Sequence, residues 1–336
     1  MDGHASRRRR CFIKRSVPHR WSVIAASACL LALAARRDSG QTDQGRAAKP
    51  TRVPAWCAKL PRPEYAHLER VHVPSDWFEV YRVEPGVYAI YEPHQWQEVI
   101  SWLIVGSRQA LLFDTGMGLE DIRAVATSLT KLPIEVLNSH THNDHVGDNW
   151  EFANVLGVDD PFTHHNEAGY SHADVAGEVT AESLCGAPAK AIDTASYRIR
   201  PFHVTSFVHD GSRIELGDRS LEVLRIPGHA PDAIALLDRA HGLLFTGDTF
   251  YEGPIYVFGK GADAAAFTRS TARLAAFVPG LRKVLASHNV PVSEPEMLVK
   301  LRDAAEAVSR GSVSGTRDGN LVTYAFGQFS LVFPVK

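Results

Sequence analysis

The stretch Asn138-Ser139-His140-Thr141-His142-Asn143-Asp144-His145 concentrates metal-binding side chains. Three imidazoles and a carboxylate fall within six residues, and both groups are common ligands of zinc and related divalent ions. The apolar run 134–137 precedes them and is typical of a strand, whose alternation would point His140 and His142 to the same side. A turn would then carry the other two candidates to a second position. Because the chain has 16 histidines, a histidine-rich surface loop is the alternative interpretation.

A polar residue follows an apolar, strand-like run at several other places in the chain. These residues are Asp114, His229 in a Pro-Gly-His turn, Asp248 in a Thr-Gly-Asp turn, and His288. A single Asp or His after a strand is usually a turn residue. Together with His140 they make five such positions, and ligands often bind where the carboxyl ends of strands meet at one edge of a sheet. The repetition therefore indicates a site rather than unrelated turns.

The order of the expected elements indicates a mixed α/β chain. A Pro-Gly turn separates two strand-like runs, 78–83 and 87–91, which predicts a hairpin. A helix is expected over 120–131, a second one from Asp263 as N-cap, and a third from Ser293, where Glu296 completes a capping-box pattern. Further strands are expected at 99–105, 109–113, 134–137, 206–208, 212–216, 221–226, 233–237, 242–245, 283–286, 321–326 and 329–335.

The ligand candidates, in this order and spacing, resemble the motif set of the metallo-β-lactamase fold superfamily. The resemblance runs from about residue 78 to the end of the chain. It implies an α/β (α+β) fold, a four-layer αββα sandwich of two mixed sheets with helices on the outer faces. It also implies two divalent metal ions as cofactors, with zinc expected. Carried over, the first ion would be bound by His140, His142 and His229, and the second by Asp144, His145 and His288; Asp248 would bridge them, and Asp114 would orient a ligand imidazole.

Such a site implies a hydrolase, in which a metal-bridging hydroxide attacks a small ester, lactone, thioester or amide. Asp144 and Asp248 are the expected catalytic carboxylates. The bridging Asp248 is typical of the thioesterase, lactonase and phosphodiesterase branches and commonly absent from true β-lactamases. Two alternatives remain open: activity on β-lactams, and a mononuclear iron oxidoreductase resembling the persulfide dioxygenases, although the latter has no need of His145 and His288.

Several residues outside the ligand set are candidates for contact with a small-molecule substrate. Tyr251, Tyr256 and His165 are interpreted either as substrate contacts or as packing residues. The loops near Trp77, 150–190 and 250–260 are expected to shape specificity.

The first 35 residues have the layout of an export signal peptide. Arg9-Arg10-Cys11-Phe12-Ile13-Lys14 resembles the twin-arginine motif, and the apolar run 21–35 is short for a spanning helix. An uncleaved anchor or a disordered basic tail is the alternative. The predicted organisation is an export signal at 1–35, a linker and strap at 36–70, and a catalytic domain at 71–336. The mature protein is expected in the periplasm or secreted, with no stable membrane insertion.

Removal of the signal leaves an excess of acidic side chains, so no nucleic-acid partner is expected. It also leaves two cysteines, Cys57 and Cys185. In an oxidising compartment they either form one disulfide or remain two buried thiols.

Overall fold

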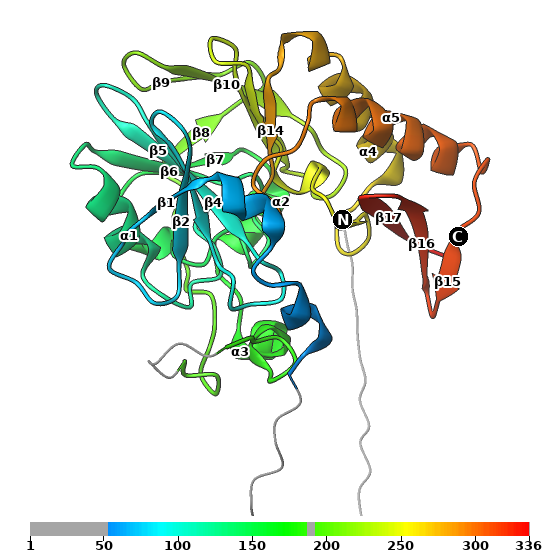
Figure 1. The fold of residues 1–336 in the computed structure, drawn as a ribbon, viewed down its shortest axis with the longest axis horizontal. Coiled ribbons are helices and arrows are strands. Elements are labelled where there is room, and N and C mark those ends of the chain that lie inside the picture. Colours follow the sequence, from blue (N-terminus) through cyan, green and yellow to red (C-terminus); the bar gives the residue numbers. More distant parts are fainter. Residues whose placement is uncertain (1–52, 187–191, 336) are drawn as a thin grey trace, which may run out of the picture. The chain divides into compact units, whose positions relative to one another are not determined.

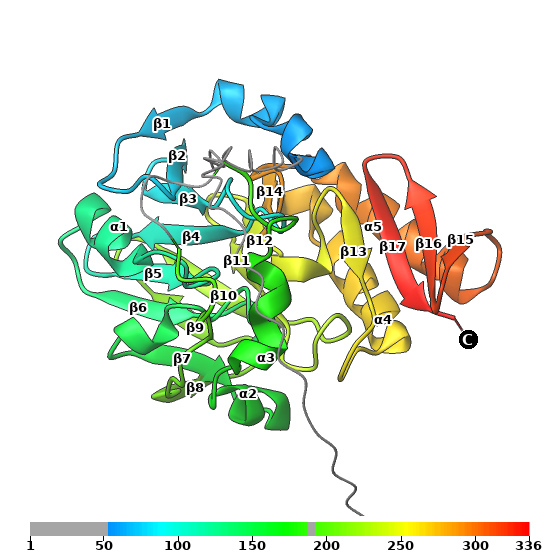
Figure 2. The same cartoon turned by 90° about the horizontal axis from the view of Figure 1, so that it is seen from below.

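The computed structural model describes residues 53–186 and 192–335. The predicted export signal and residues 36–52 of the predicted linker and strap lie outside these residues. Two sheets pack face to face, and helices cover their outer faces (Figures 1 and 2). The predicted αββα sandwich is thus confirmed, with a third, smaller sheet beside it.

The first sheet has eight strands in sequence order, antiparallel from β1 to β5 and parallel from β5 to β8. Its strands are β1 (Glu69–Val71), β2 (Glu79–Glu84), β3 (Val87–Tyr91), β4 (Ile100–Val105), β5 (Ala110–Phe113), β6 (Ile134–Leu137), β7 (Val155–Val158) and β8 (Ser206–Val208).

The second sheet has the order β14-β12-β11-β10-β9, and only β12 and β14 pair in parallel. Its strands are β9 (Arg213–Glu215), β10 (Ser220–Arg225), β11 (Ile234–Asp238), β12 (Leu243–Phe245) and β14 (Lys283–Leu285). The third sheet contains β13 (Pro254–Tyr256), β17 (Phe329–Pro334), β16 (Leu321–Phe326) and β15 (Thr316–Asp318), in that order.

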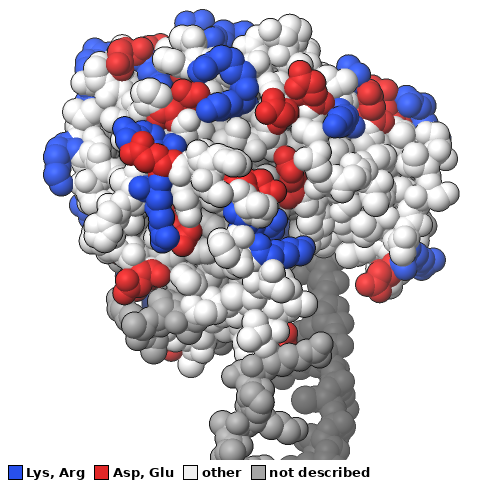
Figure 3. Space-filling model, in the orientation of Figure 1, with Lys and Arg blue, Asp and Glu red and all other residues white. Residues whose placement is uncertain are grey.

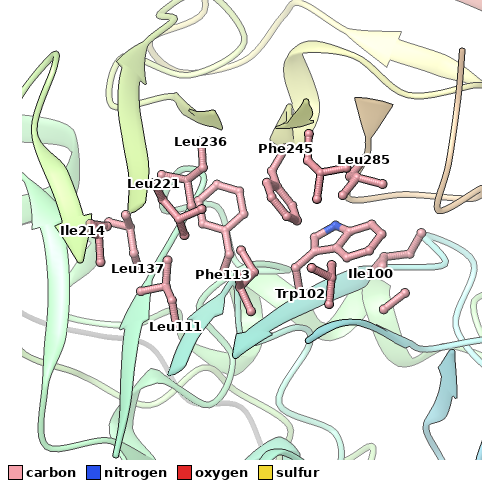
Figure 4. Close-up of a cluster of buried hydrophobic side chains, with 14 of the residues drawn as sticks. Ile100, Trp102, Leu111, Phe113, Leu137, Ile214, Leu221, Leu236, Phe245 and Leu285 are labelled. Atoms are coloured by element: carbon pink, nitrogen blue, oxygen red, sulfur yellow. The ribbon is translucent and has the colours of Figure 1, made fainter. Parts of the chain in front are cut away.

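Successive side chains of a buried strand point to opposite faces of the sheet, so they pack into two separate apolar layers. In β4 and β5, Trp102 and Phe113 face the second sheet, where Phe245 packs edge-on against both rings (Figure 4). The intervening Leu103 and Leu112 face outward and pack with α1 (Ile122–Leu129). Because both faces of these strands are covered, they are apolar except at Ser101 of β4, rather than alternately polar.

The outer face of the second sheet is covered by α4 (Ala264–Ala275) and α5 (Glu296–Ser309). The predicted cap of α4 is confirmed, since Asp263 accepts hydrogen bonds from the amides of Ala265 and Ala266. The predicted capping box of α5 is wrong. Pro295 is its N-cap, and Ser293 instead pairs with Val284 through backbone hydrogen bonds in both directions and donates its hydroxyl to Glu252.

Two short helices lie between β7 and β8, α2 (Pro161–Asn166) and α3 (His172–Val175). Before β1, residues 53–68 form a segment, called the strap below, that contains the 3-10 turns Ala55–Lys59 and Pro63–His67. Among the described residues, no helix is long and apolar enough to cross a membrane.

Candidate metal centre

The predicted ligands lie on loops that leave five strands at one edge of the sandwich. Asp114 follows β5, and the 138–145 loop follows its parallel neighbour β6. The other three loops leave β10, β12 and β14 of the second sheet. Backbone hydrogen bonds tie the two sheets together here, from Ile100 to Ser287 at 2.8 Å and from Ile234 to Ser139 at 2.8 Å.

A glycine lets two of these loops approach closely. Gly247 has φ +51°, and a Cβ at this position would lie 2.6 Å from the Cβ of Ser139. Any side chain would therefore separate the Thr-Gly-Asp turn from the 138–145 loop. Gly247 therefore allows the loop that carries Asp248 to lie against the loop that carries His140.

Three imidazole nitrogens converge in the first group of side chains. His140 Nε2 lies 2.9 Å from His142 Nδ1 and 3.2 Å from His229 Nε2, and the latter two nitrogens are 3.0 Å apart. Tetrahedral ligands about 2.0–2.1 Å from a zinc ion would be roughly 3.3 Å apart. The triangle therefore has the dimensions of one face of a metal site.

The second group contains Asp144, His145, Asp248 and His288, all buried. His145 Nε2 lies 3.4 Å from Asp144 Oδ2 and 3.3 Å from Asp248 Oδ1. His288 Nε2 lies 3.0 Å from that same Asp248 oxygen. These atoms are the donors that a divalent ion requires, gathered within ligand distance of a common point.

Asp248 faces both groups of side chains. Its Oδ1 contacts His145 and His288, and its Oδ2 lies 3.5 Å from His229 Nε2 of the first group. The carboxylate thus occupies the position expected of a bridge.

Most of these imidazoles are oriented through the ring nitrogen that faces away from the centre. His229 Nδ1 lies 2.6 Å from the carbonyl of Tyr256, and His288 Nδ1 lies 2.7 Å from the carbonyl of Gln97. His145 Nδ1 lies 3.0 Å from Asp114 Oδ2. Hydrogen bonds of this kind select the tautomer that presents Nε2 to a metal.

Asp114 holds three parts of the site. Besides His145, it accepts hydrogen bonds from the Ser139 amide at 2.6 Å and the Ser287 hydroxyl at 3.1 Å. Its φ of 71° lies in the left-handed region, which a non-glycine residue adopts at a cost. The predicted orienting role therefore matches its contacts.

The charges of the two groups differ. Burial and the neighbouring histidines lower the pKa of His140 well below its usual range, and burial and His229 lower the pKa of His142 to about 3. Both rings are neutral near pH 7 and offer a lone pair. Burial also opposes protonation of His145 and His288, but the carboxylates around them outweigh it and raise both pKa values.

Two buried atoms in the second group lack a hydrogen-bond partner among the described residues. They are His145 Nε2 and Asp248 Oδ1, whose close contacts with each other and with His288 do not have the geometry of hydrogen bonds. Burying a polar atom without a hydrogen-bond partner costs free energy. An atom whose partner is a metal ion would show no hydrogen bond to the protein, as these two atoms do. The residues present therefore fit a bound cation.

A cavity of about 890 Å³ opens onto both groups. Tyr251 and Tyr256 line it, as expected for substrate contacts, although the Tyr251 hydroxyl donates to the carbonyl of Pro254. His165 is exposed on α2 and does not line the cavity. The loop near Trp77 does not line this cavity, and the Trp77 ring is buried and donates to Glu92.

The sequence interpretation missed the residues that hold the backbone between His140 and His142. Thr141 contacts Asp232, and its carbonyl accepts hydrogen bonds from Asn166 and Tyr170. Asp232 belongs to the same Pro-Gly-His-Ala-Pro-Asp turn as His229, which was the available signal.

A protein-family model described as the metallo-beta-lactamase superfamily matches residues 96–288, more than half of the chain. The chain belongs to this superfamily. This membership confirms the expectation of an enzyme from a hydrolase superfamily.

The chain is similar to curated members of several kinds. It is 29% identical over 198 residues to the acyl-coenzyme A thioesterase MBLAC2 of Bos taurus, covering 54% of this chain and 69% of the relative. It is 26% identical over 225 residues to the hydroxyacylglutathione hydrolase of Aeromonas salmonicida (strain A449), covering 66% and 73%. The sec-alkylsulfatase Pisa1 of Pseudomonas sp. shares the fold, with a TM-score of 0.50, 16% identity and coverage of 70% and 44%.

Proposed function

We propose that the chain is a dinuclear metal-dependent hydrolase that cleaves a small ester, lactone or thioester outside the cytoplasm. The position of Asp248 between two ligand groups is the observation that carries this proposal. A carboxylate in contact with both groups supports two neighbouring ions rather than one.

The candidate ligands and Asp114 each have a defined part in this proposal. Two divalent ions, with zinc expected, would supply a hydroxide at neutral pH and polarise the bond under attack. His140, His142 and His229 would hold one ion, and Asp144, His145 and His288 the other, with Asp248 shared. Asp144 and Asp248 would also hold the attacking water by accepting its hydrogen bonds, and Asp114 would keep His145 in the required orientation.

The side chains around the metal centre favour a small substrate over a coenzyme A thioester. Among the described lining residues, Lys59 and Arg62 are the only Lys or Arg side chains, and Arg62 is paired with Glu98. The lining also includes the carboxylates of Glu64, Glu178 and Glu252. A coenzyme A group carries several phosphate charges, which an acidic wall would repel. On the face of the molecule shown in Figure 3, charges of both signs are interspersed.

Export is supported by the disulfide between Cys57 and Cys185, whose Cα atoms are 5.8 Å apart. This pairing agrees with one of the two states expected for these cysteines. Disulfides persist mainly in oxidising compartments such as the periplasm.

Metal analysis combined with hydrolysis assays tests the proposed reaction. The purified mature chain is expected to contain two zinc ions and to hydrolyse neutral aryl esters or lactones in preference to acyl-coenzyme A. One iron ion per chain together with oxygen consumption would overturn it in favour of the persulfide dioxygenase-like alternative.

A further inference from the structure

The strap forms part of the wall of the cavity above the metal centre. Trp56, Lys59, Arg62 and Glu64 line the same cavity as the ligand candidates His142 and His288. The strap precedes the part of the chain that the superfamily model matches, residues 96–288. It therefore reaches the site from outside the matched region.

One end of the strap is attached to the loop that follows α3. The Cys57–Cys185 disulfide joins positions 128 residues apart in the sequence. Beside it, the indole nitrogen of Trp56 donates to the carbonyl of Glu182 at 2.9 Å. This hydrogen bond fixes the polar edge of the half-buried ring.

A partly buried ion pair holds the middle of the strap. Arg62 donates to both carboxylate oxygens of Glu98 at 2.5 and 2.6 Å and to Asn289 Oδ1 at 2.8 Å. Glu98 is 2% exposed and also accepts from the Tyr91 hydroxyl. Since Asn289 directly follows His288, the strap contacts the neighbour in sequence of a ligand candidate.

The far end of the strap is held by aromatic packing. The ring of Tyr65 is buried, with its centroid 4.4 Å from that of Tyr91 and 4.7 Å from that of Tyr81. Residues 56–62 are thus anchored on both sides. A wall fixed in this way loses little conformational entropy when a ligand packs against it.

Aromatic side chains from other segments contribute to the same cavity. Trp96, Tyr256 and Phe258 line it together with Trp56. Aromatic linings bind apolar groups, whereas the metal centre would bind the polar group under attack.

We infer that the strap is a specificity-determining wall, in which Trp56 contacts an aromatic or branched apolar acyl group of the substrate. The inference rests on the proposed function for the location of the scissile bond at the metal centre. The disulfide serves this recognition by holding Trp56 in place and does not contribute to metal binding.

Calorimetric titration with two carboxylates tests the inference without relying on hydrolysis. The zinc-loaded protein is titrated with 4-phenylbutyrate, a product-like probe with an aromatic end, and with acetate, which lacks it. Trp56→Ala is expected to weaken 4-phenylbutyrate binding about tenfold, the loss that corresponds to roughly 50 Å² of apolar contact. Acetate binding and zinc content are expected to stay unchanged.

Val53→Ala is the matched control, because Val53 lies on the strap, is 70% exposed and does not line the cavity. It should alter binding of neither probe. The double variant Cys57→Ser, Cys185→Ser should weaken 4-phenylbutyrate binding in the same direction as Trp56→Ala, with full zinc content. If this double variant does not fold, 4-phenylbutyrate binding by Trp56→Ala tests the inference without it.

Three results would overturn the inference. Trp56→Ala could bind 4-phenylbutyrate as tightly as the wild type does, it could lose affinity for both probes equally, or the wild type could bind neither probe. Failure of the proposed reaction gives a different pattern. In that case the wild type would show the probe preference and its dependence on Trp56 but would hydrolyse no ester.

Discussion

Asp232 accepts hydrogen bonds from both the backbone amide and the hydroxyl of Thr141, at 3.1 and 2.6 Å. Thr141 separates His140 from His142, so this one carboxylate oxygen holds the backbone that places two ligand candidates. Asp232 is buried and lies three residues after His229. It therefore connects loops from the two sheets within the first ligand group.

Asp232→Ala should weaken both the fold and the metal site. Loss of this buried carboxylate leaves the amide and hydroxyl protons of Thr141 without an acceptor, at a cost of about 2–3 kcal/mol in the free energy of unfolding. Zinc affinity should fall about 10–100-fold, as for other residues that support ligands. Denaturant unfolding of the apo protein and competitive zinc titration measure the two effects. Thr163→Val is the control, because Thr163 donates to the same oxygen but does not hold Thr141.

Asp144 and Asp248 should differ in the number of metal ions that each affects. Asp144→Ala removes a donor from the second group only, so about one ion per chain should remain on the three histidines. Asp248→Ala removes the donor in contact with both groups and should lower the occupancy of both. Elemental analysis after dialysis distinguishes the variants. Equal metal content in the two would show that Asp248 does not bridge.

Two buried carboxyl groups should make the fold less stable as pH rises. Burial raises the pKa of Glu92 to about 7, and that of Asp148 to about 8. Between their ordinary values and these values, the folded chain keeps protons that the unfolded chain has released. Stability should therefore fall from about pH 5 to pH 8, by at most about 1.4 kcal/mol per pH unit for each group.

Glu92→Gln and Asp148→Asn should each flatten this decline, because an amide does not titrate. Denaturant unfolding at several pH values is the measurement, carried out on the metal-free protein so that metal binding does not contribute. Glu64→Gln, at an exposed position, serves as the control. A decline of equal slope in all three variants would contradict the assignment.

The route of export can be tested within the arginine run at positions 7–10. Replacement of Arg9 and Arg10 by Lys should block delivery through the twin-arginine pathway, which reads the arginine pair. The same replacement at Arg7 and Arg8 should have little effect, because these residues precede the motif. Immunoblots of periplasmic and cytoplasmic fractions report the outcome, and equal delivery of both variants would exclude this route.

Local patterns in the sequence were sufficient to locate the candidate centre. Asp114, His140 and His288 each follow a short apolar run, and the structure brings all of them to one edge of the sandwich. The same patterns located most strands of the two large sheets, because these strands are buried and largely apolar.

Contacts between distant segments could not be predicted in this way. Arg62 and Asn289 are 227 residues apart, and nothing in either local sequence indicates the partner. The strands β1 and β15 were missed because they are mostly polar and exposed, without the apolar run that marks other strands of the same length. The pairing of β13 with β17 created a third sheet that was not expected.

The ligand candidates come from both halves of the sandwich, the 138–145 loop after β6 and three loops from the second sheet. A cation bound among them would cross-link the two sheets at one edge. Unfolding would then have to release the ion, so the melting temperature should rise with free zinc concentration and fall with a chelator, by the logic of mass action. In an environment where metal supply fluctuates, the lifetime of the folded enzyme would therefore depend on the same ions as its chemistry.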